Sequence, residues 1–444
     1  MTESSVSGAS PSGPSASEPS PSGPSPSETA DLLSFLDASP SPWHAVRSSV
    51  DRLRAAGWEQ VDETTPWRAV DNGFVVRGAA LVAWRRPVGS STASPFRIVG
   101  AHTDSPGLRI KPRPDMGQFG WRQLGVEVYG GALLNSWLDR DLGIAGRVVL
   151  DDGSVHDVAV HEPIARVPQL AIHLDREVND KGLVLDKQLH LTPVWGTGVG
   201  APGDFAAWLA DRANLDLATI AWWELCLFDI TPAIVLGADR SLIASARLDN
   251  QLSCWAATTA LIDARAPTSH TPVIALFDHE EVGSESSTGA SGPLLATILE
   301  RLTNGWGGER EAFLEALAGS SCVSADNAHA VHPNYPERHE PGHRPIVNHG
   351  PAIKVNSNQR YATSAETAAL FRRACERAEV PWQVFVSRNN MPCGSTIGPL
   401  TATALGIPTV DVGVPQLSMH SARELCGASD PQYLAKALSA YFTL

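Results

Sequence analysis

The chain has 444 residues, which exceeds what one hydrophobic core usually supports, so we expect two domains or one domain with a large insertion. Its formal net charge of -14, with no cluster of Lys and Arg, excludes a surface built to neutralise nucleic-acid phosphates. No apolar run approaches a membrane span and no signal-peptide pattern opens the chain, so we expect a soluble cytoplasmic protein without a membrane partner.

Residues 1–28 are mostly Ser, Pro, Gly and Ala. Such a composition cannot offset the entropy of ordering by burial, so we expect a disordered tail. After a short amphipathic stretch, "SPWHAVRSSVDRLRAAGW" predicts a helix with Ser41 as N-cap, Pro42 in its first turn and Gly57 as C-cap. The stretches "FVVRGAALVAWRR" and "PFRIVGAHTDSP" predict strands, and the second runs from apolar into polar residues at His102.

The texture of the sequence changes between residues 115 and 235. Short alternating segments such as "GRVVLDDGSVHDVAVHEP", separated by turn signals, predict a β-rich insertion there. Beyond it, "QLSCWAATTALIDARA", "AETAALFRRACERAEV" and "DPQYLAKALSAYF" predict helices, while "TPVIALF", "SSCVSAD" and "PTVDVGV" predict strands. Alternating strands and helices on both sides of the insertion, in 29–114 and 236–444, predict one layered α/β domain.

Side chains suited to metal binding follow several of the predicted strands. In open α/β sheets, chemistry collects at the carboxyl ends of strands, and two histidines and three carboxylates stand at such ends here. Each short motif alone also fits an ordinary solvated loop, but their recurrence at five strand ends favours a shared site. Imidazole and carboxylate suit Zn, Co or Mn, and one carboxylate can bridge a pair of divalent ions. The expected ligands are His102, Asp249, Glu281, Asp326 and His420.

The stretch "FDHEEVGS" places two adjacent glutamates at one of these strand ends. A two-metal hydrolase requires a general base beside its reactive water, and a glutamate next to a ligand glutamate stands at that place. We therefore expect Glu281 to bind metal and Glu280 to move protons. The HExxH zinc helix is absent, because Gly283 occupies the position of its second histidine.

Ten ordered stretches, covering nearly the whole chain after the tail, resemble the aspartyl aminopeptidase and aminopeptidase I family of dinuclear zinc exopeptidases. They include "GAHTDSPGLRIKP", "WLDRDLGIAGRV", "RLDNQLS", "FDHEEVGS", "SADNAHAVHPNY" and "DVGVPQLSMHSARE". The resemblance implies a layered α/β zinc-peptidase domain with a mixed central sheet, interrupted by a β-rich dimerisation domain. It also implies a homo-oligomer that is built from dimers and can reach a dodecamer. The implied substrates are peptides with a free N-terminus.

The same resemblance distributes the ligands between two ions. It implies that His102 and Asp326 bind one ion and that Glu281 and His420 bind the other. Asp249 is similar to the carboxylate that bridges the two ions.

Three further residues gain catalytic roles from the resemblance. Asp104 resembles an acid that orients a metal-binding imidazole, a common task of carboxylates behind such ligands. Glu280 matches the general base. His173 in "LAIHLDRE" occupies the position of a histidine that reaches the active site of a neighbouring subunit, where it would help to stabilise the oxyanion.

Substrate preference is the last property that the resemblance addresses. An acidic first residue requires a cationic pocket, and Lys354 resembles the family position that meets the substrate carboxylate. His329 and His349 lie in the same basic stretch and are also expected to bind substrate. A neutral, leucine-type preference is one alternative, and another dinuclear amidohydrolase is a second. The alternative outside enzymes is an inactive oligomeric scaffold that keeps the fold.

Overall fold

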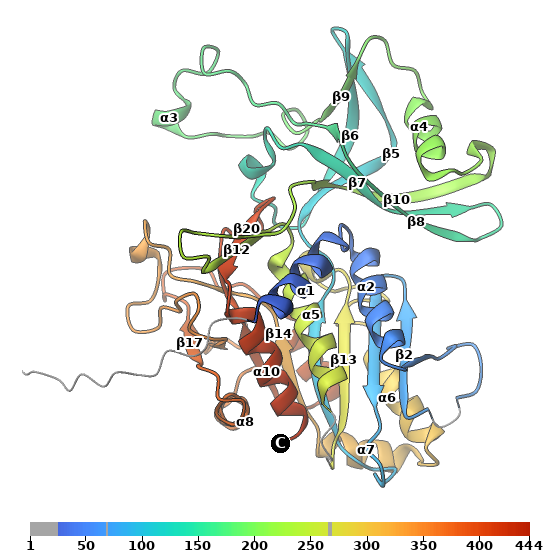
Figure 1. The fold of residues 1–444 in the computed structure, drawn as a ribbon, viewed down its shortest axis with the longest axis vertical. Coiled ribbons are helices and arrows are strands. Elements are labelled where there is room, and N and C mark those ends of the chain that lie inside the picture. The colour runs from blue at the N-terminus through green and yellow to red at the C-terminus, as the bar shows by residue number, and fades with distance from the viewer. Residues whose placement is uncertain (1–24, 68–69, 265–268) are drawn as a thin grey trace, which may run out of the picture.

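The computed structural model describes residues 25–67, 70–264 and 269–444 as three β-sheets with helices around them (Figure 1). The part of the predicted tail before residue 25 lies outside the described residues. The predicted tail ends too late at residue 28, because residues 26–28 form the first turn of helix α1 (Pro26–Asp37). Pro26 opens this helix, where its missing N–H costs nothing.

The largest sheet has nine strands and is mixed, as expected. Its four central strands run parallel to one another, while antiparallel pairs flank them on both sides. In spatial order the strands are β1 (Glu59–Gln60), β2 (Asn72–Arg77), β3 (Ala80–Arg85), β13 (Thr271–Phe277), β4 (Phe96–His102), β14 (Ser321–Ala325), β18 (Thr409–Gly413), β16 (Ala352–Val355) and β17 (Gln383–Val386). The stretch "FVVRGAALVAWRR", which we predicted as a strand, forms the hairpin β2–β3, because Gly78 adopts a left-handed φ of 57° that reverses the chain.

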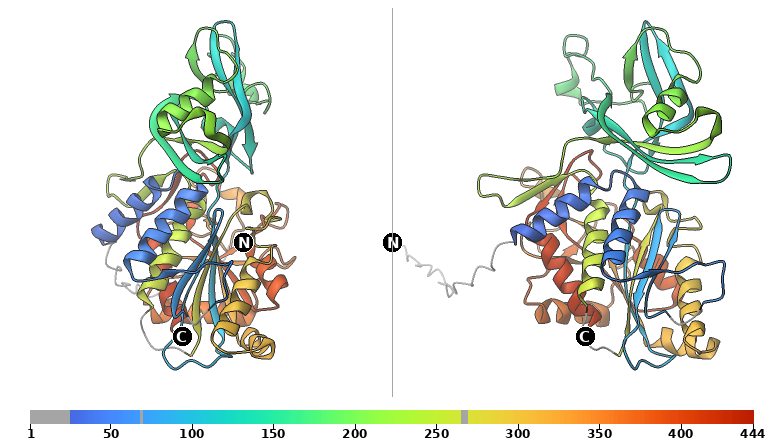
Figure 2. Two further views of the ribbon diagram at one scale, coloured as in Figure 1. Left: turned by 90° about the vertical axis from the view of Figure 1, so that its right-hand side faces the viewer. Right: turned by 45° about the vertical axis from the view of Figure 1, so that its right-hand side comes forward.

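Helices cover both faces of this sheet (Figures 1 and 2). Neighbouring strand residues such as Ile98 and Val99 belong to different cores, as alternating strand side chains require. One core includes helices α1, α2, α5, α8 and α10, and the other includes α6, α7 and α9. The helices not yet delimited are α2 (Pro42–Ala55), α5 (Leu248–Asp263), α6 (Leu294–Gly305), α7 (Arg310–Ala318), α8 (Ala365–Arg377), α9 (Ile397–Leu405) and α10 (Asp430–Phe442).

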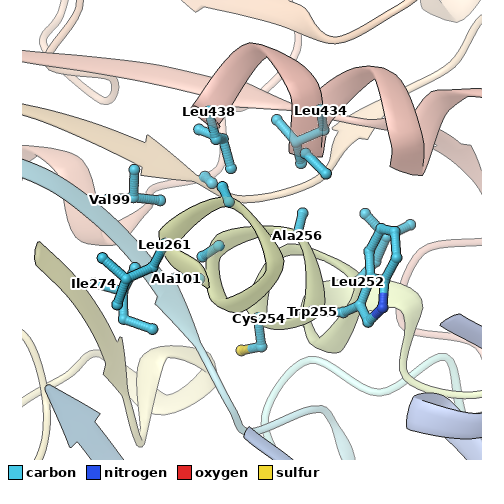
Figure 3. Packing of buried hydrophobic residues seen from close by; sticks show 14 of the residues in the cluster. Val99, Ala101, Leu252, Cys254, Trp255, Ala256, Leu261, Ile274, Leu434 and Leu438 are labelled. Atoms are coloured by element: carbon cyan, nitrogen blue, oxygen red, sulfur yellow. The ribbon is translucent and has the colours of Figure 1, made fainter. Parts of the chain in front are cut away.

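Helix α5 is the most deeply packed of these helices. Figure 3 shows its apolar side chains between the central strands and α10, with Leu261 near Ile274 of β13 and with Leu434 and Leu438 of α10 opposite. Burial of a leucine-sized side chain contributes roughly 1.5–3 kcal/mol, so several such contacts fix the helix firmly. The first turn of α5, which carries Asp249, is therefore held in place by the core.

A second sheet of six antiparallel strands projects beyond the first (Figures 1 and 2). It begins at Gly107, earlier than the predicted boundary at residue 115, because the polar stretch after His102 continues directly into a strand. In spatial order its strands are β8 (Val155–Ala165), β7 (Leu142–Leu150), β10 (Ile220–Asp229), β5 (Gly107–Gln118), β6 (Trp121–Tyr129) and β9 (Val194–Thr197). The short helices between these strands in the chain are η1 (Leu134–Trp137), α3 (Val178–Lys181), α4 (Asp204–Ala213) and η2 (Leu217–Thr219).

A third, five-stranded sheet lies between the other two in Figure 1. Its strands in spatial order are β11 (Ile234–Leu236), β12 (Leu242–Ser245), β20 (Glu424–Gly427), β19 (Pro415–Leu417) and β15 (Ala328–His329). The prediction that Asp249 ends a strand is wrong, since β12 stops at Ser245 and Arg247, with a left-handed φ of 58°, turns the chain into α5. Among the described residues, no helix combines the length and apolar character needed to cross a membrane.

Candidate metal centre

The carboxyl ends of the central parallel strands bring the first site residues together. His102 is the last residue of β4, and Asp326 directly follows the neighbouring strand β14. Strand β13, on the other side of β4, ends at Phe277, which pairs with His102. Glu280 and Glu281 follow shortly after it in the short helix η3 (Glu280–Val282). Three adjacent strands therefore deliver four of the expected side chains to one edge.

The two glutamates lie in a tight turn after the end of β13. His279 before them adopts a left-handed φ of 63°, which starts the turn. The backbone N–H groups of Glu280 and Glu281 each donate a hydrogen bond of 3.1 Å to the carboxylate of Asp104. One buried carboxylate therefore fixes the backbone of both glutamates.

Asp249 and His420 complete the cluster from the other side. The two carboxylate oxygens of Asp249 face different histidines: Oδ1 lies 3.5 Å from Nε2 of His102 and Oδ2 lies 3.5 Å from Nε2 of His420. Asp326 Oδ1 lies 3.8 Å from the first of these nitrogens, and Glu281 Oε2 lies 3.4 Å from the second. The structure thus forms two ligand groups, each with one histidine and two carboxylates, that share Asp249.

The chemistry of these groups fits divalent cations. In each group the possible ligand atoms lie within 4.8 Å of one another. Asp249 Oδ1 and Glu281 Oε1 are buried and accept no hydrogen bond from any described residue. Burial, reinforced by the charge of Asp249, raises the pKa of Glu281 well above its usual range. A buried carboxylate without donors is neutralised either by a proton or by a cation, and mixed imidazole and carboxylate ligands suit zinc and its neighbours.

Glu280 differs from the other carboxylates in its exposure to the pocket. Its side chain is 14% exposed, against 11% for Asp326, 5% for Glu281 and 4% for Asp249. Its Oε2 lies 4.0 Å from Nε2 of His102, so Glu280 also belongs to a possible third group with His102 and Glu281. Burial raises the pKa of Glu280 to about 7, and the charges of Asp326 and Asp249 add to the effect.

Both histidines present the same nitrogen to the cluster. Nδ1 of His102 lies 3.1 Å from the main-chain oxygen of Asp104, and Nδ1 of His420 lies 3.1 Å from that of Gly131. A carbonyl accepts a hydrogen bond only from a protonated Nδ1, so the lone pair of a neutral ring is on Nε2, toward the carboxylates. Asp104 also accepts a hydrogen bond of 2.7 Å from the hydroxyl of Tyr129, at the end of β6.

Two residues that position the site were not predicted from the sequence. The first is Tyr129. The second is the buried Glu424, which accepts hydrogen bonds from the backbone N–H of Asp249 at 2.9 Å and of His420 at 2.7 Å. Burial raises the pKa of Glu424 to about 8, and the charge of Asp249 contributes. The sequence offered one signal, an acidic residue four positions after His420 at the end of "SMHSARE", but such a polar stretch equally suits an exposed turn.

The expected substrate-binding residues are only partly brought together. Lys354 and His329 line a pocket of about 430 Å³ that contains the metal cluster. His349 is exposed and lies outside that lining, with Nδ1 bonded to its neighbour Val347. Lys354 is buried, donates a hydrogen bond of 3.1 Å to the main-chain oxygen of Asn327, and lies 3.5 Å from Asp326 Oδ2. Its charge is therefore already compensated inside the protein.

His173 is not among the residues that line the metal pocket. It occupies an exposed turn before α3, on an arm that extends from the six-stranded sheet (Figure 1). It makes no hydrogen bond or ion pair with any of the described residues. Its neighbours Leu170, Ile172 and Leu174 are large apolar side chains that are also exposed.

A family model described as aminopeptidase I zinc metalloprotease (M18) matches residues 35–442. The chain belongs to the M18 family. A probable M18 family aminopeptidase 2 from Streptomyces coelicolor is 56% identical to it over 418 residues, covering 93% of this chain and 97% of that protein. As an M18 family member the chain is a metalloaminopeptidase, an enzyme that hydrolyses peptide bonds.

Solved structures share the fold over most of this chain. The structure of Chaetomium thermophilum mApe1 is 31% identical, covers 94% of this chain and 97% of that chain, and superposes with a TM-score of 0.83. A structure described as the mApe1 dodecamer of S. cerevisiae is 25% identical, covers 94% of this chain and 96% of that chain, and has a TM-score of 0.80. The expected mixed α/β fold with several sheets is therefore confirmed.

Proposed function

We propose that this M18 aminopeptidase uses two divalent ions, most simply zinc, to remove the N-terminal residue of peptides. His102 and Asp326 would hold one ion and His420 and Glu281 the other, with Asp249 between them. The observation that supports this most directly is that the two oxygens of Asp249 face the two different histidines. When bound, such ions polarise the scissile carbonyl and lower the pKa of the reacting water.

We propose that Glu280 is the general base. It is the carboxylate of the cluster most open to the pocket, and its backbone is anchored to Asp104. It can therefore take a proton from the water and return it to the leaving amine without being displaced. Its elevated pKa, about 7, is close to the value that suits proton transfer at neutral pH.

We also propose that the six-stranded sheet and its connections, which begin at Gly107 and were predicted as residues 115–235, serve as a dimerisation domain and that neighbouring subunits complete the active site. The exposed position of His173, between apolar side chains that are exposed in one chain, favours a contact with a second copy. The relative described as a dodecamer supports a homo-oligomer. In such an assembly His173 would stabilise the oxyanion in a neighbouring site.

The first residue of the substrate is proposed to be Asp or Glu. Lys354 and His329 line the metal pocket and would be nearest to its side chain. The ion pair between Lys354 and Asp326 favours the alternative, a neutral preference, because that cation already has a partner. His349 is not part of this proposal, since it lies outside the pocket.

The proposed chemistry is tested with aminoacyl reporters of Asp, Glu and Leu, assayed on wild type and on the variants Glu280→Gln and Glu281→Gln. We expect chelator to abolish activity and zinc, cobalt or manganese to restore it. Glu280→Gln should lower kcat by about 10²–10⁴-fold and still bind two metal ions per chain, because it removes only the proton acceptor. Glu281→Gln is the matched control and should lose bound metal, measured by elemental analysis.

Each alternative gives a different result in this assay. Activity that survives both chelator and Glu280→Gln would rule out the mechanism. Cleavage of N-acylated but not of free aminoacyl substrates would indicate another dinuclear amidohydrolase. Metal binding without turnover of any substrate would indicate a scaffold. The ranking of Asp, Glu and Leu reporters decides between the acidic and the neutral preference.

A further inference from the structure

A second pocket, of about 210 Å³, adjoins the metal pocket. The two pockets share His329, Tyr361 and Gly394 as lining residues, so together they form a continuous surface around the rings of His329 and Tyr361. Phe385, whose ring lies 5.9 Å from that of His329 and 6.3 Å from that of Tyr361, also lines the second pocket. A peptide bound at the metal cluster can therefore extend into this second pocket.

The two pockets differ in their charged side chains. Carboxylates of the cluster dominate the metal pocket, whereas Arg338 and Arg388 line the second one. The acid in the second pocket is Glu340, and its carboxylate lies 2.6 Å from Nδ1 of His343. The guanidinium groups of Arg338 and Arg388 would therefore favour a negatively charged group of a substrate in the second pocket.

Of the two arginines in the second pocket, Arg388 is the one without a carboxylate partner among the described residues. It donates a hydrogen bond to the main-chain oxygen of Glu337 and forms no ion pair with a carboxylate of the described residues. Arg338 is highly exposed and lies 3.8 Å from the carboxylate of Glu337. Lys354, in contrast, is buried against Asp326. A guanidinium has five N–H donors in a planar fork, so Arg388 retains donors for an incoming carboxylate.

The position of the second pocket indicates which part of the peptide enters it. The first residue must lie against the metal cluster, because its carbonyl is the one that water attacks. The metal pocket, at about 430 Å³, accommodates that residue by itself. The residues that follow the scissile bond are then the ones that reach past His329 and Tyr361.

We propose that the pocket around Arg388 binds a carboxylate of the peptide downstream of the scissile bond, carried by the second or third residue. This inference rests on the proposed aminopeptidase function and adds a substrate class to it: peptides with an acidic residue shortly after the N-terminus. Arg388 is the specificity-determining residue, and the apolar ring of Phe385 contacts the carbon chain of the bound side chain.

The test uses peptide pairs that differ only in the downstream charge. Each peptide carries the same first residue, with Asp or Asn at position two or three and an amidated C-terminus, and a reporter with that first residue and no second residue is the reference. For wild type we expect kcat/KM about 10-fold or more higher for Asp than for Asn at one of these positions, because a charged hydrogen bond is gained. Arg388→Gln should abolish that ratio and leave the reporter unchanged.

Two further variants keep the result interpretable. Arg388→Lys retains the charge but not the fork, so we expect an intermediate ratio of Asp to Asn turnover. Arg373→Gln, an exposed arginine of α8 outside both pockets, makes the same charge change and should behave as wild type. Unchanged thermal unfolding of Arg388→Gln shows that the variant folds.

Several outcomes would overturn the proposal. Equal turnover of Asp and Asn peptides by wild type would show that the pocket does not recognise a downstream carboxylate. An equal loss for peptides and reporter in Arg388→Gln would place its role at the first residue instead. If wild type cleaves no reporter at all, the failure lies in the proposed function and not in this pocket.

Discussion

The buried carboxylates of the metal centre divide into two kinds by their hydrogen bonds. Asp104 and Glu424 accept backbone N–H donors on both oxygens, and Asp104 accepts a tyrosine hydroxyl as well. Asp249 and Glu281 each keep one buried oxygen without a donor. A carboxylate that is saturated by donors positions its neighbours, whereas one with a free oxygen can bind a cation. This difference distinguishes Asp249 and Glu281, as candidate ligands, from Asp104 and Glu424, as supports.

The variant Glu424→Gln tests the positioning role. An amide keeps one acceptor oxygen, but its NH₂ group must face the N–H of Asp249 or of His420, where two donors repel. We expect the affinity for metal to fall by about 10–100-fold while the fold is retained. Competition with a chelator of known affinity measures the affinity for metal. The control is Glu315→Gln, which changes an exposed glutamate of α7. Wild-type affinity in Glu424→Gln would contradict the role.

At the scale of single elements, the starts of helices do much of the positioning. Helix α5 begins with non-helical backbone at Asp249, with φ of -84° and ψ of 105°, while the rest of the helix is fixed by the core. Helix α10 begins at Asp430, whose carboxylate accepts hydrogen bonds from the backbone N–H groups of Asn348 and Gly350. The same acid therefore fixes both the helix start and the loop beside it.

Asp430 predicts a dependence of stability on pH. Burial raises its pKa from 3.8 to about 6. Between these values the folded protein keeps a proton that the unfolded chain has lost, so the free energy of unfolding decreases as pH rises through this window. The raised pKa, from 3.8 to about 6, corresponds to a loss on the order of 3 kcal/mol.

Urea unfolding of metal-free wild type and Asp430→Asn between pH 4 and pH 7, roughly the window of the shift, measures this effect. We expect the stability of wild type relative to the variant to fall as pH rises and then to level off. Asp263→Asn, an exposed residue at the end of α5, is the control and should follow wild type. Parallel pH profiles for wild type and Asp430→Asn would disprove the assignment.

At the scale of the whole molecule, the six-stranded sheet contributes to the metal centre through its connections. Tyr129 at the end of β6 donates to Asp104, and Gly131 shortly after it contacts His420. The same sheet carries the arm with His173 (Figure 1). The insertion therefore supports the candidate site of its own chain and carries the arm that we propose to contact a neighbouring copy.

Complementation between two inactive variants tests whether His173 acts on a neighbouring subunit. Glu280→Gln lacks the base and His173→Ala lacks the arm histidine, so each alone should show reduced kcat. When the two are co-expressed, some sites combine an intact Glu280 with His173 from the other variant. We expect activity above that of either variant alone, together with a mass of several subunits by light scattering. Activity that equals the average of the two variants would mean that His173 does not act in a neighbouring site.

The amino-acid sequence by itself determined the layered fold and most of the candidate metal centre. The sequence shows apolar runs followed by His102, by Asp326 and by the pair of glutamates. Because parallel strands bring their carboxyl ends to one edge of the sheet, these residues could be predicted to lie together. The local pattern also predicted α2 with Ser41 at the N-cap position, although the Ser41 hydroxyl bonds to His44 and not to the helix backbone, and the C-cap is Ala56 in place of Gly57. These features depend on residues close together in the chain.

Only the tertiary structure decided the rest. Glu424 meets Asp249 across 175 residues, and no local pattern records that this glutamate is buried or which N–H groups face it. The same holds for Tyr129, which reads as the end of an exposed strand, and for Lys354, whose charge is compensated by Asp326. Burial and distant partners determine whether a carboxylate binds, supports or titrates, and they exist only once the chain has folded.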